Sequence, residues 1–291
     1  MIDFLQMVLN GIAAGSSYAL VGLGMVLIYK ASEVPNFVQG EMALLPVFVA
    51  FMLLESYGVP PYMAFPITLI FAFFLGCFLE FAILRRAKDP NILGLIIITI
   101  GMEMILLGLV SWKFGADQRV MPFPISEYDS IAIGNLFISS LNMLTLVAAL
   151  FIMLVLFLFF RYSKIGVAMK ASQQNETAAR LMGIKTKQVR MLTWGISAMV
   201  GTVAGLLLAP VIMEPFMMWN PMMKGFAGAV VGGMTSLPGA VIGAYIIGVI
   251  ENLFGGYVSI EFKSVVAFAV IVLVLCVRPS GLFARHYVKK V

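Results

Sequence analysis

Charged residues are scarce in this sequence. Asp, Glu, Lys and Arg make up 11% of its 291 residues, whereas 62% of the residues are hydrophobic. The mean hydropathy is +1.03. A soluble domain carries roughly 25% charged and 45–50% apolar residues, so this chain lacks the polar surface that water requires. The composition excludes a soluble enzyme, a disordered segment and a disulfide-rich secreted fold, and it predicts a polytopic membrane protein.

Histidine and cysteine are almost absent. The single histidine is His286, in a basic C-terminal segment, and the two cysteines, Cys77 and Cys276, lie inside apolar runs. A histidine-based metal site or proton relay has almost no residues to use, and buried thiols of this kind are usually packing residues. An intramembrane enzyme would need paired His, Asp or Cys side chains, which the sequence does not offer. We therefore expect no metal, no cofactor and no catalytic residue in this chain.

Hydrophobic runs of membrane length divide the chain. They extend over about 4–29, 62–84, 92–112, 141–160, 191–213 and 264–277, and a shorter run covers 37–54. The apolar stretch 225–254 is broken by Ser236-Leu-Pro-Gly239. Because one span needs about 20 residues, this stretch predicts two short, glycine-rich segments or a re-entrant hairpin. The expected fold is an all-α transmembrane bundle, a single domain over 1–291, with eight or nine membrane segments.

The N-terminal sequence is expected to remain in the protein. Met1-Ile-Asp-Phe lacks a basic leader, and the apolar run that follows exceeds the core of a signal peptide. We therefore interpret this run as the first membrane span.

The basic residues predict the orientation of the chain. Most of the 19 Lys and Arg residues fall in three connectors, 85–88, 161–190 and 278–290. Positively charged connectors stay in the cytoplasm, which places the N-terminus outside and the C-terminus inside. The segment 113–140 is then an external loop and 161–190 a cytoplasmic loop. Since these charges flank membrane spans and form no groove for phosphates, no nucleic-acid partner is expected.

The cytoplasmic loop predicts a short amphipathic helix. Asn175 is suited to cap it, Glu176 falls in its first turn, and Gly183 can end it in a left-handed turn. The helix would have about eight residues, roughly 12 Å at 1.5 Å per residue. Three residues share one face by their spacing: Ala178, Leu181 and Met182. Such a helix either docks on a partner or lies on the lipid surface.

Four elements of the sequence resemble those of a known transporter family. Glu176-Thr-Ala-Ala-Arg-Leu-Met-Gly183 resembles the EAA-type coupling loop of ABC importer permeases, with Thr177 as a departure from the simplest pattern. Asn36-Phe-Val-Gln-Gly-Glu41 is similar to the NFAQGE element of the branched-chain amino-acid permeases. Further matches are 232–243 and 278–283. The resemblance covers nearly the whole chain, and the short length is similar to that of the smaller of the two paired permeases.

The resemblance implies a transport subunit in the bacterial inner membrane. Such a permease pairs with a second, homologous permease and carries branched-chain amino acids that a periplasmic binding protein delivers. Two cytoplasmic ATPase subunits hold ATP and magnesium, and this chain has no Gly-x-x-x-x-Gly-Lys phosphate loop of its own. The ATPase-coupling residues that the resemblance implies are Glu176, Ala178, Ala179, Arg180, Leu181, Met182 and Gly183. The family also contains permeases for urea, short amides and other amino acids, and no residue discriminates among them.

Glu41 is the first candidate for the translocation path. An ionisable group in hydrocarbon is costly and is usually functional. Asn36, Gln39 and Gly40 gather beside Glu41, directly after Pro35. A polar, proline-broken start of a short segment is typical of irregular backbone that lines a cavity. A helix cap is the alternative interpretation.

Other carboxylates and the glycines leave alternatives open. Glu103 is a second path candidate, or it packs against another helix; Glu80 is expected to reach the membrane interface near Arg85, and Glu251 can do the same. The alternative transport class is an ion-coupled secondary transporter, which needs buried acid–base or ion-binding groups. These glutamates are scattered along the chain and meet that need only in part. Glycines recur at three- and four-residue spacing near 11–24 and 225–243, where they serve either within-chain packing or a subunit interface.

Overall fold

The computed structural model describes residues 2–87, 91–125, 129–133 and 136–283. Lys88, His286 and the basic residues after position 283 enter the sequence predictions but lie outside the described residues.

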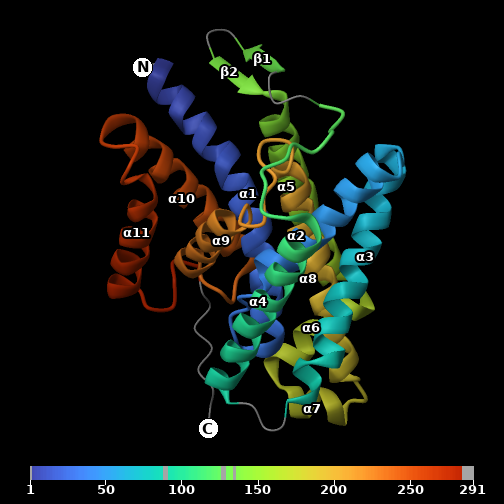
Figure 1. Ribbon diagram of the computed structural model, residues 1–291. Helices are drawn as coiled ribbons and strands as arrows, with labels where there is room; N and C mark the ends of the chain where they lie inside the picture. The colour runs from blue at the N-terminus through green and yellow to red at the C-terminus, as the bar shows by residue number, and fades with distance from the viewer. Residues whose placement is uncertain (1, 88–90, 126–128, 134–135, 284–291) are drawn as a thin grey trace.

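The described chain is mainly helical (Figure 1). Its helices are α1 (Ile2–Ser32), α2 (Gln39–Phe51), α3 (Pro61–Ala82), α4 (Ile92–Phe114), α5 (Ser140–Tyr162), α6 (Lys164–Gln174), α7 (Glu176–Leu181), α8 (Thr186–Leu208), α9 (Trp219–Gly232), α10 (Leu237–Tyr257) and α11 (Lys263–Val277). A π-helical turn (Met52–Ser56) extends α2, and a 3-10 turn (Leu84–Arg86) follows α3. The strands β1 (Ser130–Ile133) and β2 (Leu136–Ser139) form an antiparallel hairpin that pairs Ser130 with Ser139.

Seven helical stretches in the described ranges are long and apolar enough to cross a membrane. They are α1, α2 with its π-helical turn, α3 with its 3-10 turn, α4, α5, α8 and α10. α11 is a shorter apolar helix of 15 residues, and α9 has 14 residues. The prediction of a polytopic all-α bundle is confirmed.

The stretch 225–254 divides where the sequence predicts, but its second part is not short. Gly233 has φ of +101°, and the Ser236 hydroxyl accepts a hydrogen bond from the Gly239 amide at 3.1 Å, which caps α10. α10 then continues for 21 residues, to Tyr257, and is one of the seven possible spans. The break at Ser236–Gly239 is the cap of α10, so the helix that follows is continuous.

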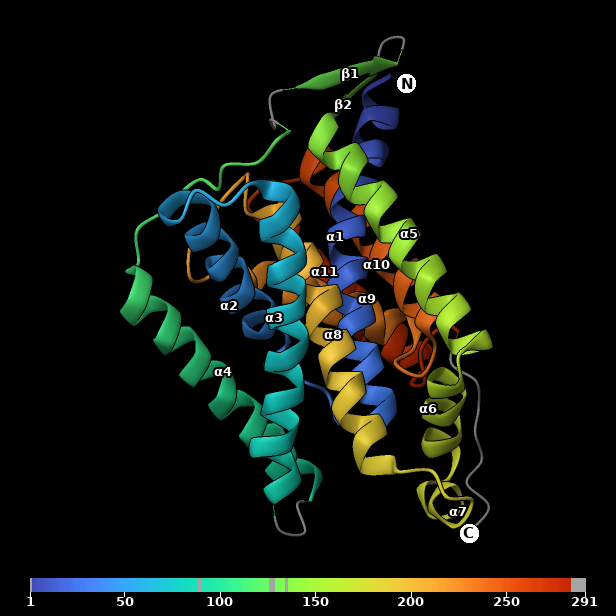
Figure 2. The ribbon, with the colours of Figure 1, turned by 90° about the vertical axis from the view of Figure 1, so that its right-hand side faces the viewer.

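α1 runs through the centre of the bundle (Figures 1 and 2). Buried residues make up 83% of its most apolar stretch, against 17% in α4 and 22% in α5. α1 packs on α8, α9 and α10, whereas α4 and α5 expose large apolar side chains such as Ile97, Met104 and Phe151. Contiguous exposed apolar surface of this kind indicates contact with lipid.

The regularly spaced glycines pack helices within the chain. A Cβ atom on Gly15 of α1 would lie 2.9 Å from the Tyr245 Cα atom of α10, and one on Gly22 would lie 2.9 Å from the Gly225 carbonyl oxygen of α9. A Cβ atom on Gly228 of α9 would lie 2.6 Å from the Ala244 Cα atom. Small residues let helix backbones approach closely in a membrane. Of the two interpretations, within-chain packing therefore applies to the junction of α1, α9 and α10.

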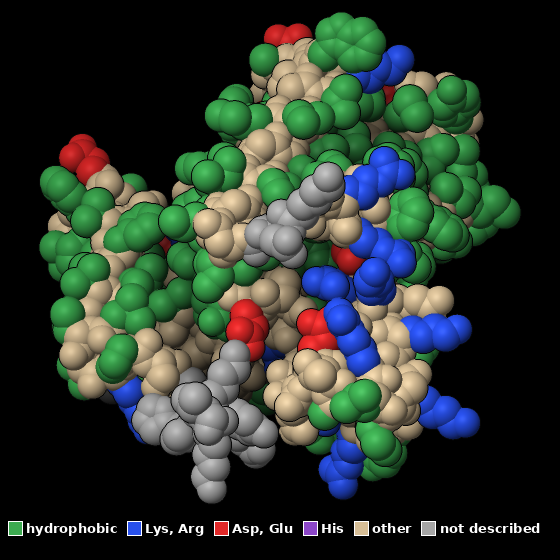
Figure 3. Space-filling view, turned by 90° about the horizontal axis from the view of Figure 1, so that it is seen from below, with side chains coloured by type: hydrophobic (Ala, Val, Ile, Leu, Met, Phe, Trp, Pro, Cys, Tyr) green, Lys and Arg blue, Asp and Glu red, His purple; other side chains and the backbone are tan. Residues whose placement is uncertain are grey.

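The two ends of the bundle differ. The hairpin and the start of α1 lie together at one end, while α6 and α7 lie at the other (Figure 1). The Gln6 side chain holds β2 to α1: its Nε2 donates to the Phe137 carbonyl oxygen at 2.6 Å, and its Oε1 accepts from the Phe137 amide at 3.0 Å. Viewed from the α7 end, Lys and Arg side chains gather on the surface (Figure 3).

Candidate functional site

The loop between α5 and α8 folds into two short helices. Ser163 caps α6, and the Asn175 Oδ1 atom accepts a hydrogen bond from the Ala178 amide at 2.9 Å, which caps α7. Gly183 closes the loop with φ of +82°. The predicted cap and C-terminal glycine are confirmed. α7 has six residues rather than about eight, because Met182 already departs from helical geometry, and the sequence reasoning missed α6.

α7 exposes an apolar tip. The Leu181 and Met182 side chains are 84% and 83% exposed, and Ala178 on the same face is exposed as well. Ala179 is buried against the rest of the chain, at 4% exposure. Of the two alanines in the predicted coupling set, Ala178 is therefore open to a partner and Ala179 faces the chain itself. Consecutive residues of a helix point in different directions. Ala179 therefore packs against the rest of the chain and anchors α7, while Ala178 faces outward.

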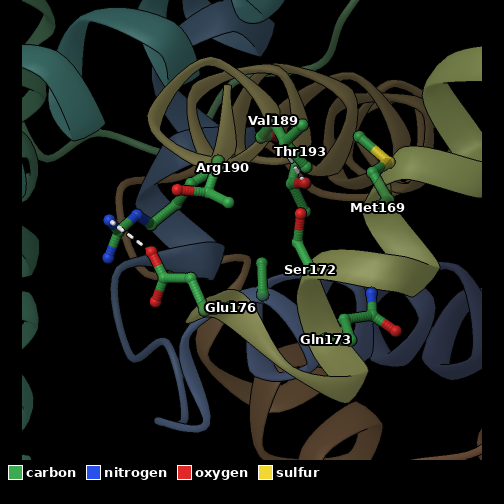
Figure 4. Close-up of a pocket in the computed structure, with 9 residues that line it drawn as sticks. Met169, Ser172, Gln173, Glu176, Val189, Arg190 and Thr193 are labelled. Atoms are coloured by element: carbon green, nitrogen blue, oxygen red, sulfur yellow. Dashed lines mark hydrogen bonds and ion pairs between the residues drawn. The ribbon is translucent and has the colours of Figure 1, made fainter. Parts of the chain in front are cut away.

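A chain of charges joins α7 to the bundle. The Arg180 Nη2 atom lies 2.5 Å from Glu176 Oε1. The Arg190 Nη2 atom lies 3.9 Å from the same oxygen (Figure 4). The Arg180 Nε atom also donates to the Thr186 hydroxyl at 3.0 Å. Partial burial opposes ionisation of Glu176, but hydrogen bonds from Arg180 and Thr186 and the charges of Arg180 and Arg190 outweigh it and lower the pKa of Glu176.

Arg190 continues this chain into the membrane bundle. Its Nε atom lies 3.5 Å from the Glu80 Oε1 atom of α3, and the Glu80 side chain is buried. Glu80 is therefore buried within the chain near the end of α3, where α8 supplies a cation for it. The sequence reasoning missed Arg190, although its position near the start of a predicted span is a usable signal.

Two small cavities flank Arg190. One, of about 20 Å³, is lined by Ser172, Glu176 and Thr193, among others (Figure 4). The other, of about 70 Å³, includes Asn36 and Glu80 among its lining residues. Buried polar atoms here lack hydrogen-bond partners among the described residues, namely Asn36 Oδ1, both Glu80 carboxylate oxygens and Ser172 Oγ. Polar cavities of this size have room for a water molecule.

Asn36 also belongs to a buried polar cluster at the start of α2. Asn36 Nδ2 donates to Gln39 Oε1 at 3.3 Å, and Gln39 Nε2 donates to the Ser197 carbonyl oxygen of α8 at 3.2 Å. The Ser197 hydroxyl lies 2.8 Å from both Gln39 Oε1 and the Gly24 carbonyl oxygen of α1. The Gln39 side chain fits against α8 because residue 201 is a glycine. A Cβ atom on Gly201 would lie only 2.7 Å from the Gln39 Nε2 atom. The cluster ties α1, α2 and α8 together.

Comparison with known proteins places the chain in a family. Residues 7–275 match the family described as the branched-chain amino acid transport system permease component. The chain is 34% identical to the high-affinity branched-chain amino acid transport system permease protein LivH of Salmonella typhimurium and 33% identical to that of Escherichia coli K12. Each alignment covers 99% of this chain and 98% of the relative. The chain belongs to this permease family. The resemblance in the sequence is confirmed.

A solved structure shares the fold of this permease. PsaBC from Streptococcus pneumoniae, in complex with a Fab, matches it with a TM-score of 0.51 at 12% identity, over 95% of this chain and 92% of that chain. At this low sequence identity, the structural match supports the helical architecture and nothing about function.

Two of the predicted path residues lie on helices that pack against each other, α2 and α4. Glu41, in the first turn of α2, is 4% exposed, and its charge acts on that of Glu103 in α4, which is partly exposed. The Glu41 Oε2 atom has no hydrogen-bond partner among the described residues. Gly40 lies against α9, where a Cβ atom would lie 3.1 Å from the Met222 sulfur. Asn36 and Gln39 point instead into the cluster at α8.

A second buried ion pair joins α9 and α10 of the permease. Lys224 Nζ lies 2.5 Å from Glu251 Oε1, the Tyr18 hydroxyl donates to Glu251 Oε2 at 3.1 Å, and Lys224 Nζ lies 5.4 Å from the Tyr18 ring centroid. Glu251 is buried within the chain, between α1, α9 and α10. The sequence reasoning missed Lys224 and Tyr18; a lysine inside an apolar stretch is itself a signal that an acid lies nearby.

The described residues contain no group of three or more His, Cys, Asp or Glu side chains that could hold a metal ion. The charged side chains of the site are instead paired or face small cavities. Such an arrangement is suited to transmitting movement between helices and to lining a polar path.

Proposed function

We propose that this chain is the membrane-spanning subunit of an ATP-driven ABC importer for branched-chain, hydrophobic amino acids. The family and the printed names of its relatives support the substrate class. A second homologous permease completes the path, and a periplasmic binding protein delivers the amino acid. Two cytoplasmic ATPase subunits bind ATP and magnesium, so the chain is a transport subunit and not an enzyme. Its place is the bacterial inner membrane.

The exposed tip of α7 is the observation that carries this proposal. Leu181 and Met182 are more than four-fifths exposed at the end of the bundle opposite the hairpin. Exposed apolar side chains on a short helix held by a buried anchor need a partner surface. The charge chain through Glu176, Arg190 and Glu80 then transmits a movement of α7 to α3 and α8.

The same proposal orients the chain. The N-terminus and the loop 113–140 lie outside, and the loop 161–190, with Gly183 and Arg180, lies in the cytoplasm. The gathering of Lys and Arg side chains at the α7 end supports this orientation (Figure 3). Counted with α9 and α11, the helices give nine membrane segments, an odd number, which agrees with an N-terminus outside and a C-terminus inside.

We place the translocation path beside α2 and α4. Glu41 and Glu103 are the carboxylates that face it, and the unpartnered Glu41 oxygen supports this placement. Asn36, Gln39 and Gly40 act as positioning residues, because they hold the start of α2 against α8 and α9. Polar side chains at a broken helix start are usual at membrane binding sites.

Affinity purification of the tagged chain from its native membranes tests the assembly. Wild type is expected to bring down two ATPase chains and a second permease. Leu181→Asp with Met182→Asp should lose the ATPases and keep the second permease. The control is Val167→Asp, which changes a half-exposed apolar residue of α6 in the same loop and should keep every partner. Recovery of the chain alone, with full uptake after reconstitution without ATP, would contradict the proposal and favour an ion-coupled transporter.

Uptake by the reconstituted assembly tests the energy source and the substrate. Leucine uptake should stop when ATP is removed and persist when ion gradients are dissipated. Urea, acetamide and a polar amino acid should compete poorly with leucine. Strong competition by urea or acetamide would assign the permease to another substrate class of the same family.

A further inference from the structure

A groove runs beside α5 on a face of the bundle away from Glu41. Its volume is about 690 Å³, and α1, α5, α6 and the start of α10 contribute to its wall. α5 stands at the edge of the bundle next to α1 (Figure 2). Leu156, Phe157 and Phe160 give the groove an apolar wall. The groove reaches the apolar exterior, because Leu154 and Phe157, which line it, are about half exposed.

Three cations lie at the α6 end of this groove. Lys30 lies in the last turn of α1, Arg161 lies in the last turn of α5, and Lys170 belongs to α6. The residues that line the groove include no Asp or Glu. Every ion pair between described residues uses Arg180, Arg190 or Lys224 as its cation, so these three cations have no acid partner in that part of the chain.

The arrangement of the cations is unfavourable without an anion. Lys30 is partly buried and close enough to Lys170 for their charges to repel each other. Lys30 and Arg161 have only aromatic rings beneath them: Lys30 Nζ lies 5.8 Å from the Phe160 centroid, and Arg161 Cζ lies 5.9 Å from the Phe157 centroid. Two like charges on a low-dielectric wall favour a bound negative charge.

We propose that this groove binds an anionic phospholipid. Its phosphate lies among Lys30, Arg161 and Lys170, and an acyl chain lies along the apolar wall of α5. Basic pockets between membrane helices favour acidic headgroups, and each Lys or Arg near a membrane surface contributes about 1 kcal/mol. The amides of Gln173 and Gln174 line the same end and supply uncharged hydrogen-bond donors. The proposal is independent of which substrate crosses the membrane.

The charges favour lipid over a helix of the partner permease. A transmembrane helix that filled the groove would need acids at the level of Lys30 and Lys170, and acids are rare in membrane helices. An anionic lipid brings the charge and the apolar chain in one molecule and is abundant around the exposed face of α5. Its expected effect is to hold α6, and through it the coupling loop, at a fixed distance from α1.

Native mass spectrometry of the assembled transporter tests the proposal. Titration with phosphatidylglycerol should show one tightly bound lipid per copy of this chain, and phosphatidylcholine should bind at least tenfold more weakly. Lys30→Gln with Lys170→Gln should weaken phosphatidylglycerol binding by an order of magnitude or more. The matched control, Arg86→Gln with Lys185→Gln, removes two exposed charges that do not line the groove and should leave binding unchanged.

Further arms separate the lipid from other occupants. Leu154→Trp fills the apolar wall, keeps all three cations and should weaken lipid binding; inorganic phosphate at equal concentration should not displace the lipid. The proposal would be overturned by any of three results. These are equal weakening of lipid binding in the matched control, displacement of the lipid by phosphate, and unchanged lipid binding in Leu154→Trp. A crosslink from Leu154→Cys to the second permease, in place of bound lipid, would also overturn it and assign the groove to the subunit interface.

Discussion

At the scale of single residues, Arg190 connects the coupling loop to the membrane bundle. It lies between Glu176 of the coupling loop and Glu80 inside the bundle, 14 and 110 positions away in the chain. A buried carboxylate without its cation is costly, so Arg190 holds α3 and α8 together and couples both to α7. Gln39 has a similar role between α1, α2 and α8, with neutral hydrogen bonds.

Arg190→Gln is expected to lower the free energy of unfolding by about 2–3 kcal/mol. This is less than the 3–5 kcal/mol of a fully buried pair, because the Arg190 side chain is 34% exposed. Glu80→Gln removes the buried charge, so the double variant should recover most of the loss. Denaturant unfolding in detergent measures all three. Additive losses in the double variant would show that Glu80 and Arg190 do not interact.

A pH titration isolates Glu176. Because its pKa is lowered below the ordinary value of 4.5, its ion pairs contribute fully above about pH 4.5 and are lost as the pH falls through the lower, folded-state pKa. Amide hydrogen exchange in α7, corrected for intrinsic rates, should be constant from pH 8 to 5 and should rise below that. Glu176→Gln should exchange faster at neutral pH and show no such step. A step of equal size in both proteins would assign it to another group.

At the scale of elements, the junction of α1, α9 and α10 depends on glycines, which have no side chain to keep the helices apart. Gly15, Gly22 and Gly228 bring backbones into contact, and the triad of Tyr18, Lys224 and Glu251 joins the same three helices by charge. Close packing positions α9, which has 14 residues and is not one of the seven possible spans.

Gly228→Ala is expected to destabilise this junction by about 1–3 kcal/mol, the usual range for overpacking. The new Cβ atom would lie 2.6 Å from the Ala244 backbone, so α9 and α10 must separate. Gly108→Ala is the matched control, because nothing lies within 4 Å of its Cβ position, and alanine favours a helix by up to about 1 kcal/mol. Thermal unfolding of both variants should change in opposite directions. Equal behaviour would mean that α9 and α10 can shift without strain.

At the scale of the whole molecule, charge is distributed between the ends and apolar surface lies between them. The hairpin marks one end, and α6 and α7 with their basic residues mark the other (Figures 1 and 3). Transport across the bilayer requires these ends to face different compartments.

Single cysteines test this orientation. In a variant without Cys77 and Cys276, Leu181→Cys should react with a membrane-impermeant maleimide only in inside-out vesicles. Ile131→Cys in β1, 44% exposed, should react only in right-side-out vesicles. The reverse pattern would invert the proposed topology, and labelling of both sites from one side would contradict a separation of the two ends by the membrane.

Much of the architecture is predictable from the sequence because it depends on local properties. Apolar runs predict the helices, Asn175 and Gly183 predict the ends of α7, and the motifs predict the family. Length was the weak point: α7 is shorter than predicted and α10 longer, since an apolar pattern does not show where a helical turn ends. The hairpin and α6 were missed because their signals are short, four residues in each strand and 11 in α6.

Composition and motif alone thus determined that this chain is a helical membrane permease, because lipid requires apolar helices wherever the chain crosses it. Only the tertiary structure decided the state of each charged residue. Glu80 and Glu251 were expected near the interface, and both are buried because Arg190 and Lys224, far along the chain, supply their cations. Ala179 points inward where Ala178 points outward. Residue spacing in the sequence does not predict which charged side chains pair when they meet only through helix packing, since the fold sets the distance between them.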